Sequence, residues 1–128
     1  MKKSFALTAV VLIALFLPAA PQQAALKEYI YVLRPGRADL LKTGHTPAER
    51  VIQEKHSEYL DQMAKKGVLI LYGRTLTTDE STFGIVIFRA ASDEEARKVM
   101  NGDPGVQGKL MTAKLYPYRI AWRETAAK

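Results

Sequence analysis

The order of apolar patterns along the chain restricts the fold more than any other feature. Segments in which apolar residues recur at every second position predict strands, and segments in which they recur every 3.6 residues predict helices. Along the chain these segments follow the order strand, helix, strand, strand, helix, strand. The predicted strands cover residues 27–33, 68–75, 82–90 and 110–122, and the predicted helices cover 47–66 and 92–100. Right-handed crossovers then place both helices on one face of a four-stranded antiparallel sheet, with the first and third strands central. The chain is therefore expected to be an α+β, ferredoxin-like βαββαβ sandwich.

Local signals mark the boundaries of these elements. Thr46 and Glu49 have the spacing of a capping box at the start of the first helix, and Ser92 and Glu95 repeat it at the second. Pro117 lies inside the last predicted strand. Because proline has no N–H for a ladder, this strand is expected at a sheet edge or at a bulge.

Both faces of the predicted sheet are apolar, although helices cover only one. Such an exposed face needs a partner, and the simplest is the same face of a second copy. We therefore expect a homodimer that forms through the exposed sheet faces. A third layer from loops or the tail is the alternative, but no apolar segment is left over to supply it. In the first strand, one face carries Tyr29, Tyr31 and Leu33 and the other carries Ile30 and Val32. In the third strand, one face carries Phe83, Ile85 and Ile87 and the other carries Val86 and Phe88.

The N-terminus has the pattern of an export signal. Lys2 and Lys3 precede an uncharged apolar run over residues 5–17, and small residues and prolines follow. The run is shorter than the roughly 20 residues that span a bilayer. We expect a signal peptide over residues 1–25, a domain over 26–123 and a C-terminal tail over 124–128. The domain is then periplasmic or secreted. An uncleaved anchor is the alternative, and only then does the protein contact a membrane.

Composition narrows the chemistry. The chain has no cysteine, so disulfides, thiolate catalysis and cysteine-bound zinc are excluded, and its two histidines disfavour a histidine-rich metal site. We expect no cofactor and no metal. The net charge of +6 is scattered, which gives weak support for an anionic ligand. Nucleic acid is not expected as a partner: "STFGIVIF" resembles an RNA-binding strand but has Ile85 where a stacking aromatic is needed.

His56 is the residue that raises a functional question. At 100° per residue, it shares a face of about 60° with Ile52, Tyr59 and Met63, so it points at the sheet. A buried imidazole needs a hydrogen-bond partner, and Asp103 in "NGDPG" leaves the neighbouring helix. Two interpretations stay open: a His56–Asp103 acid–base dyad, or a core histidine bonded to a backbone carbonyl beside a turn-forming aspartate.

The chain resembles the YCII-related family of the dimeric α/β-barrel superfamily. The likeness runs from Glu28 to Ala121 through "EYIYVLRPG", "HSEYL", "KKGVLILYGRT", "FGIVIF", "SDEEARKVMNGDP" and "AKLYPYRIAW". It implies a ferredoxin-like homodimer with stacked sheets and an active site at His56 and Asp103. Some relatives act in aromatic degradation, in dehydrochlorination or muconolactone-like isomerisation. Many members have Gly-Pro after strand two, where this chain has Gly73 and Arg74.

The functional prediction follows from the residues and the resemblance together. We expect a cofactor-free lyase or isomerase acting on a small organic acid or phenol, in which His56 takes a proton and Asp103 orients it. Gly73 is predicted to line the substrate site, where Arg74 or Arg34 would neutralise developing oxyanion charge; as an alternative, these arginines are plain surface charge. The alternative function is a non-catalytic small-ligand-binding or accessory dimer of the cell envelope.

Overall fold

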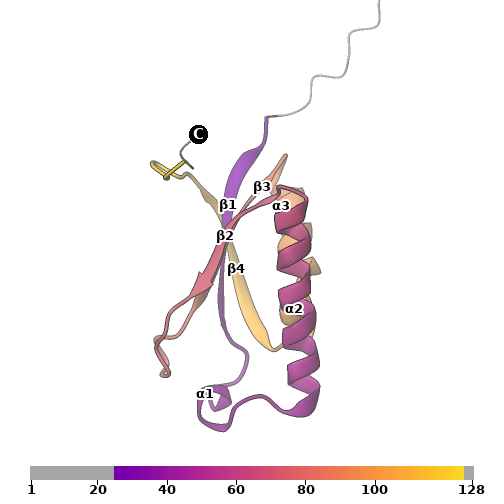
Figure 1. The fold of residues 1–128 in the computed structure, drawn as a ribbon, viewed down its shortest axis with the longest axis vertical. Coiled ribbons are helices and arrows are strands. Elements are labelled where there is room, and N and C mark those ends of the chain that lie inside the picture. The colour runs from indigo at the N-terminus through magenta and orange to yellow at the C-terminus, as the bar shows by residue number, and fades with distance from the viewer. Residues whose placement is uncertain (1–24, 126–128) are drawn as a thin grey trace, which may run out of the picture.

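The computed structural model describes residues 25–125, which form a sheet with its two long helices packed on one side (Figure 1). The expected signal peptide lies outside the described residues, apart from its last position. The strands are β1 (Lys27–Pro35), β2 (Leu69–Arg74), β3 (Gly84–Ala90) and β4 (Met111–Tyr118). The helices are α1 (Leu40–Thr43), α2 (Pro47–Lys65), α3 (Asp93–Gly102) and α4 (Pro104–Gln107).

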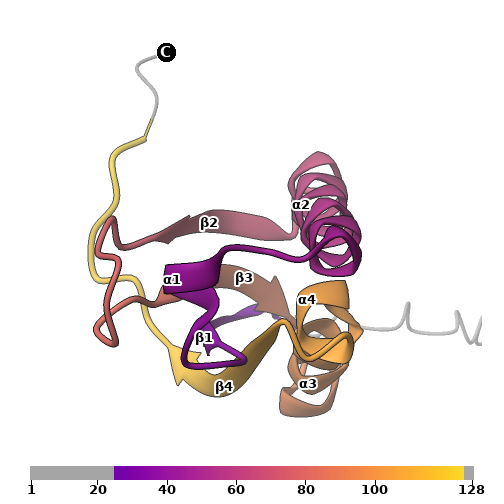
Figure 2. The same ribbon diagram turned by 90° about the horizontal axis from the view of Figure 1, so that it is seen from below.

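The sheet has the order β2-β3-β1-β4, and every neighbouring pair is antiparallel. The central position of β1 and β3 and the ferredoxin-like α+β class are thereby confirmed. Pro117 belongs to β4, an edge strand, as its missing N–H predicts. Figure 2 shows α2, α3 and α4 together on one side of the sheet. The helix-covered face of the sheet therefore contacts side chains of the two long helices.

The predicted caps form with one difference. The Thr46 hydroxyl accepts a hydrogen bond from the Glu49 N–H at 3.2 Å, and the Glu49 carboxylate accepts from the Thr46 N–H at 2.8 Å. At α3 the Ser92 hydroxyl accepts from the Glu95 N–H at 3.1 Å, but the Glu95 carboxylate accepts from the N–H of Ala91. The second box is therefore only half of the predicted motif, because the carboxylate reaches one residue further back.

The loop that joins β1 to α2 is held by Arg37. Its guanidinium donates to both carboxylate oxygens of Glu49, each at 2.8 Å, and to Asp39 at 2.9 Å. It also donates to the Gly44 carbonyl at 2.7 Å. These bonds fix the short helix α1, which the sequence did not predict, and they orient the first turn of α2. The fifth N–H of Arg37 donates to the Thr43 hydroxyl at 2.7 Å, so all five donors of this guanidinium are used within the fold.

The core lies between the sheet and the helices. Tyr29, Tyr31 and Phe88 are buried there, and the Phe88 ring lies 5.9 Å from the Tyr29 ring and 5.7 Å from the Tyr31 ring, centroid to centroid. Leu60 and Met63 of α2 pack on this aromatic cluster. The period-two pattern assigned alternate side chains of β1 to a single face, and in the structure these side chains point to the helices.

The opposite face of the sheet is only partly covered. Leu71 and Tyr116 keep 49% and 47% of their surface exposed there. The C-terminal segment, residues 119–125, lies along this side (Figure 2), and a cavity of about 710 Å³ separates it from the sheet. Ile120 and Trp122 line that cavity. Both residues were predicted as part of the last strand, but β4 ends at Tyr118, and Trp122 keeps 80% of its surface exposed.

No helix within residues 25–125 combines the length and the apolar character that crossing a bilayer requires.

Candidate active site

His56 and Asp103 meet between α2 and the turn that joins α3 to α4. The Nδ1 atom of His56 lies 2.7 Å from Oδ1 of Asp103. His56 keeps 7% of its surface exposed, and Asp103 keeps none. Of the two interpretations of His56, the geometry excludes the backbone-carbonyl partner and gives it a carboxylate.

The turn brings Asp103 to this place through local chemistry. Asp103 is the N-cap of α4, and its Oδ1 accepts from the Gly105 N–H at 2.8 Å. Pro104 fills the first helical position, where a missing N–H costs nothing. A Cβ at Gly105 would lie 3.2 Å from both Asp103 Oδ1 and His56 Nδ1, which is tighter than ordinary contact. The "DPG" sequence therefore both shapes the turn and leaves room for the imidazole.

Three donors surround the buried carboxylate. Besides His56 and Gly105, the Tyr31 hydroxyl donates to Oδ2 of Asp103 at 2.8 Å. Burial, followed by the negative charge of Asp103 and this hydrogen bond, raises the pKa of the Tyr31 hydroxyl well above its usual range. Burial and the same charge also raise the pKa of Tyr59, whose hydroxyl donates to the Val99 carbonyl at 2.8 Å. Tyr31 therefore stays protonated and remains a donor.

These donors determine which nitrogen of His56 is available. The Asp103 carboxylate accepts from Tyr31 and Gly105, and the same role toward His56 assigns the shared proton to Nδ1. Nε2 then has a lone pair. Within residues 25–125, Nε2 has no hydrogen-bond partner, and no buried side-chain nitrogen or oxygen lacks one. Nε2 therefore retains solvent-accessible surface and can accept a proton from outside.

The predicted substrate-binding residues lie in two different places. Arg74 pairs with Gly84 in the row that contains Leu33, so it belongs to the helix-covered face, at the edge strand β2. Gly73 pairs with Ile85 on the other face, and a Cβ there would meet nothing within 4 Å. Arg34 also faces away from the helices and stacks over Phe83, 5.8 Å from the ring centre. Only Arg74 shares a face with the dyad.

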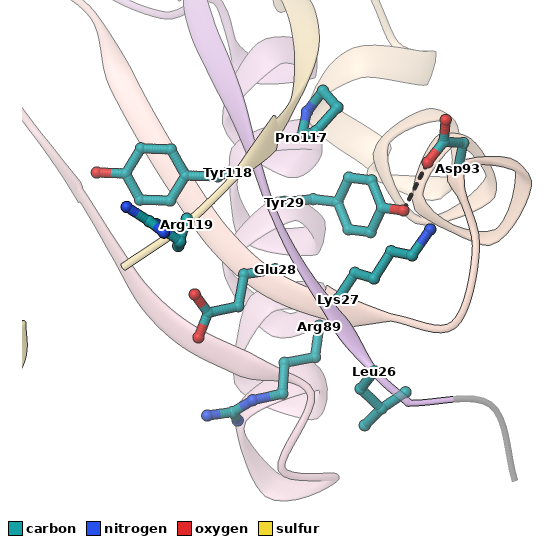
Figure 3. Close-up of a pocket in the computed structure, with 9 residues that line it drawn as sticks. All are labelled: Leu26, Lys27, Glu28, Tyr29, Arg89, Asp93, Pro117, Tyr118 and Arg119. Carbon is teal, nitrogen blue, oxygen red and sulfur yellow. Dashed lines mark hydrogen bonds between the residues drawn. The ribbon is translucent and has the colours of Figure 1, made fainter. Parts of the chain in front are cut away.

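Two of the cavities beside the sheet have linings that include neither His56 nor Asp103. One is the cavity beside the C-terminal segment. The other, of about 580 Å³, lies where β1 begins and β4 ends (Figure 3). Tyr29 and Asp93 both line this cavity, and the Tyr29 hydroxyl donates to Asp93 at 2.7 Å. Both cavities are therefore separate from the histidine site.

Two members of the site were missed by the sequence argument. Tyr31 belongs to an alternating strand, and that pattern marks it only as a core aromatic. Gly105 follows Pro104, and nothing in the pattern of neighbouring residues marks it as a contact of His56. The signal that could have found Tyr31 is its polarity, since a buried hydroxyl needs a partner. Within residues 25–125, no group of three histidine, aspartate or glutamate side chains is arranged to hold a metal ion.

Comparison with known proteins identifies the family. The profile of the YCII-related domain matches residues 28–117, which is most of the chain. The chain therefore belongs to the YCII-related domain family. A comparison with curated proteins gave no match.

A solved structure shares the fold. It is the 5-chloro-2-hydroxyhydroquinone dehydrochlorinase TftG from Burkholderia phenoliruptrix AC1100, in complex with 2,5-dihydroxybenzoquinone. The TM-score is 0.52 at 18% sequence identity, and the match covers 71% of this chain and 93% of that chain. At this identity the likeness establishes the common fold.

Proposed function

We propose that this chain is a cofactor-free lyase or isomerase that moves a proton on a small phenolic or organic-acid substrate. His56 acts as the general base through Nε2, and Asp103 orients the ring and stabilises the imidazolium that forms. The observation that carries the proposal is the 2.7 Å bond from His56 Nδ1 to a fully buried carboxylate, while Nε2 has no partner among residues 25–125.

The substrate class is proposed from chemistry and from the similar structure. TftG is named for removing HCl from a chlorinated hydroxyhydroquinone. Such an elimination needs an acceptor for the proton, while chloride leaves with its bonding electrons, and it requires no oxidant. One basic nitrogen beside a carboxylate is sufficient to accept that proton. Arg74, on the same face of the sheet, is proposed to stabilise the developing phenolate or enolate oxygen.

Chloride release from 5-chloro-2-hydroxyhydroquinone tests the proposal. We expect turnover by the wild-type protein and a loss of about 100-fold or more in His56→Ala, since a positioned acid–base group contributes roughly 10²–10⁴-fold. His45→Ala is the matched control, because His45 is the other histidine and lies in the loop before α2. Equal rates in His56→Ala and wild type would refute the role of His56.

The second candidate function is a non-catalytic ligand-binding or accessory dimer of the cell envelope. It is favoured by the position of both cavities away from the dyad. It predicts that 2,5-dihydroxybenzoquinone binds and is recovered unchanged, with equal affinity for wild type and His56→Ala. Lower affinity in His56→Ala would favour the histidine site instead.

We further propose that two copies associate through the face of the sheet opposite the helices. Leu71 and Tyr116 remain half exposed on that face, which supports an apolar interface. Leu71→Lys should shift the mass measured by analytical ultracentrifugation from dimer to monomer, whereas Lys98→Ala on the exposed side of α3 should not. A wild-type monomer at micromolar concentration contradicts the interface.

We also propose that the chain is exported, on the basis of the charged and apolar pattern of residues 1–25. Mass spectrometry of the protein from the producing cell should find a cleaved N-terminus between Ala19 and Ala25. A full-length cytoplasmic product contradicts export.

A further inference from the structure

Tyr31 is the member of the cluster around Asp103 that comes from a central strand of the sheet. It lies on β1, a central strand, and none of its surface is exposed. Its ring packs edge-on against Phe88 with the centroids 5.7 Å apart. Strand pairing to Val86 and Leu115 fixes the backbone on both sides. The hydroxyl of Tyr31 is therefore a fixed donor, set by the core rather than by a loop.

The two oxygens of Asp103 depend on different donors. Oδ1 accepts from His56 and from the Gly105 N–H, and Oδ2 accepts from the Tyr31 hydroxyl. Among residues 25–125, Tyr31 is the only donor to Oδ2. The terminal torsion of aspartate is broad, so a carboxylate held through one oxygen can turn about it. Tyr31 prevents that rotation and keeps Oδ1 in line with Nδ1 of His56.

We propose that Tyr31 is a positioning residue of the histidine site, whose hydroxyl locks the Asp103 carboxylate so that His56 presents Nε2 to a substrate. The inference rests on the proposed acid–base function and extends it to a third side chain. During turnover a proton passes from the substrate to Nε2 and back to product or water. No proton crosses from Tyr31 to Asp103, so the hydroxyl acts through geometry and charge alone.

Tyr29 supplies a matched control on the same strand. It is two residues away, faces the same side, packs on the same Phe88 ring and donates to a different carboxylate, Asp93. Tyr29→Phe and Tyr31→Phe thus each delete one hydroxyl next to one aspartate. Only Tyr31→Phe touches the histidine cluster, whose other titratable side chains are Asp103 and, on α2, Tyr59.

NMR of protein labelled with ¹⁵N-histidine reads the effect directly, because the chain has only two histidines. In Tyr31→Phe we expect the Nδ1–H signal of His56 to shift and to exchange faster with water. In Tyr29→Phe we expect the wild-type signal. An unchanged signal in Tyr31→Phe, or the same change in both variants, overturns the inference. If Tyr31→Phe does not fold, 3-fluorotyrosine placed at position 31 makes the hydroxyl more acidic without removing it, and an unmoved Nδ1–H signal is then the refuting result.

Turnover separates this inference from the proposed function. With 5-chloro-2-hydroxyhydroquinone, Tyr31→Phe should lower kcat about 10-fold or more with little change in KM, a part of the roughly 10²–10⁴-fold that an acid–base group supplies. If the NMR signal changes but wild type releases no chloride, the positioning role stands and the proposed reaction fails. If wild type releases chloride and Tyr31→Phe retains full kcat, the positioning role fails alone.

Discussion

Removal of the Asp103 carboxylate should destabilise the fold more than any other single polar change in the described structure. Asp103→Ala leaves three donors without their acceptor: the Tyr31 hydroxyl, the His56 Nδ1–H and the Gly105 N–H. A buried donor left unpaired costs about 1–3 kcal/mol. His56 retains some contact with water, so we expect a total loss of about 3–5 kcal/mol, the range found when one partner of a buried pair is removed. That is a large part of the ~5–15 kcal/mol that stabilises a small domain.

Asp103→Asn should cost less, about 1–2 kcal/mol, because most of the hydrogen bonds can re-form. The amide oxygen can still accept from Gly105 and His56. The Tyr31 hydroxyl can turn and accept from the amide nitrogen, since a hydroxyl is both donor and acceptor. The order of stability is therefore wild type, then Asn, then Ala.

Urea unfolding at pH 7, followed by circular dichroism, measures these differences. Asp93→Ala is the control, because this exposed carboxylate accepts one hydrogen bond, from Tyr29. Its loss should be clearly smaller than that of Asp103→Ala. If the two variants lose the same stability, or if Asn is no better than Ala, the hydrogen-bond assignment around Asp103 is wrong.

Further predictions concern the core, the turn and the Arg37 cluster. Leu60→Ala should lower the unfolding free energy by about 2–5 kcal/mol, because this side chain is 1% exposed and packs on the aromatic cluster. Gly105→Ala should cost about 1–3 kcal/mol by overpacking, with a perturbed His56 signal in ¹⁵N NMR; Gly73→Ala, which has free space, should cost less. Hydrogen bonds from Arg37, and then from the Thr46 N–H, lower the pKa of Glu49 from 4.5 to about 2. The folded state therefore gains stability above pH 4.5 and loses it as pH falls toward 2, so the difference in Tm between wild type and Glu49→Gln should shrink over that range and stay constant above it.

Much of the fold was predictable because its signals are local. Alternation along β1 separated the buried Tyr29 and Tyr31 from Ile30, and the Thr46 capping box located the start of α2. The short helices α1 and α4 were missed because four residues carry no periodic pattern. The position of Trp122 at the cavity beside the sheet was missed because it depends on the path of the chain after β4.

The site was predictable in part. Helical periodicity turned His56 inward, and the topology placed the end of α3 beside α2, so the His56–Asp103 pair could be anticipated. The Tyr31 hydroxyl joins them from a strand 72 residues away in sequence from Asp103, and alternation says nothing about where a hydroxyl points. Arg34 and Arg74 both lie near the end of a strand, but they face opposite sides of the sheet. The pairing register of the strands decides the side, and the sequence pattern does not determine that register.

The central claim is that His56 presents an unprotonated Nε2 to a small ligand. Titration of ¹⁵N-histidine protein with 2,5-dihydroxybenzoquinone, the compound found in the similar structure, tests it most directly. We predict that free His56 carries its proton on Nδ1 and that the ligand shifts the Nε2 signal of His56 while His45 stays unchanged. A proton on Nε2 in the free protein, or a ligand that shifts neither ring or only His45, would contradict the account.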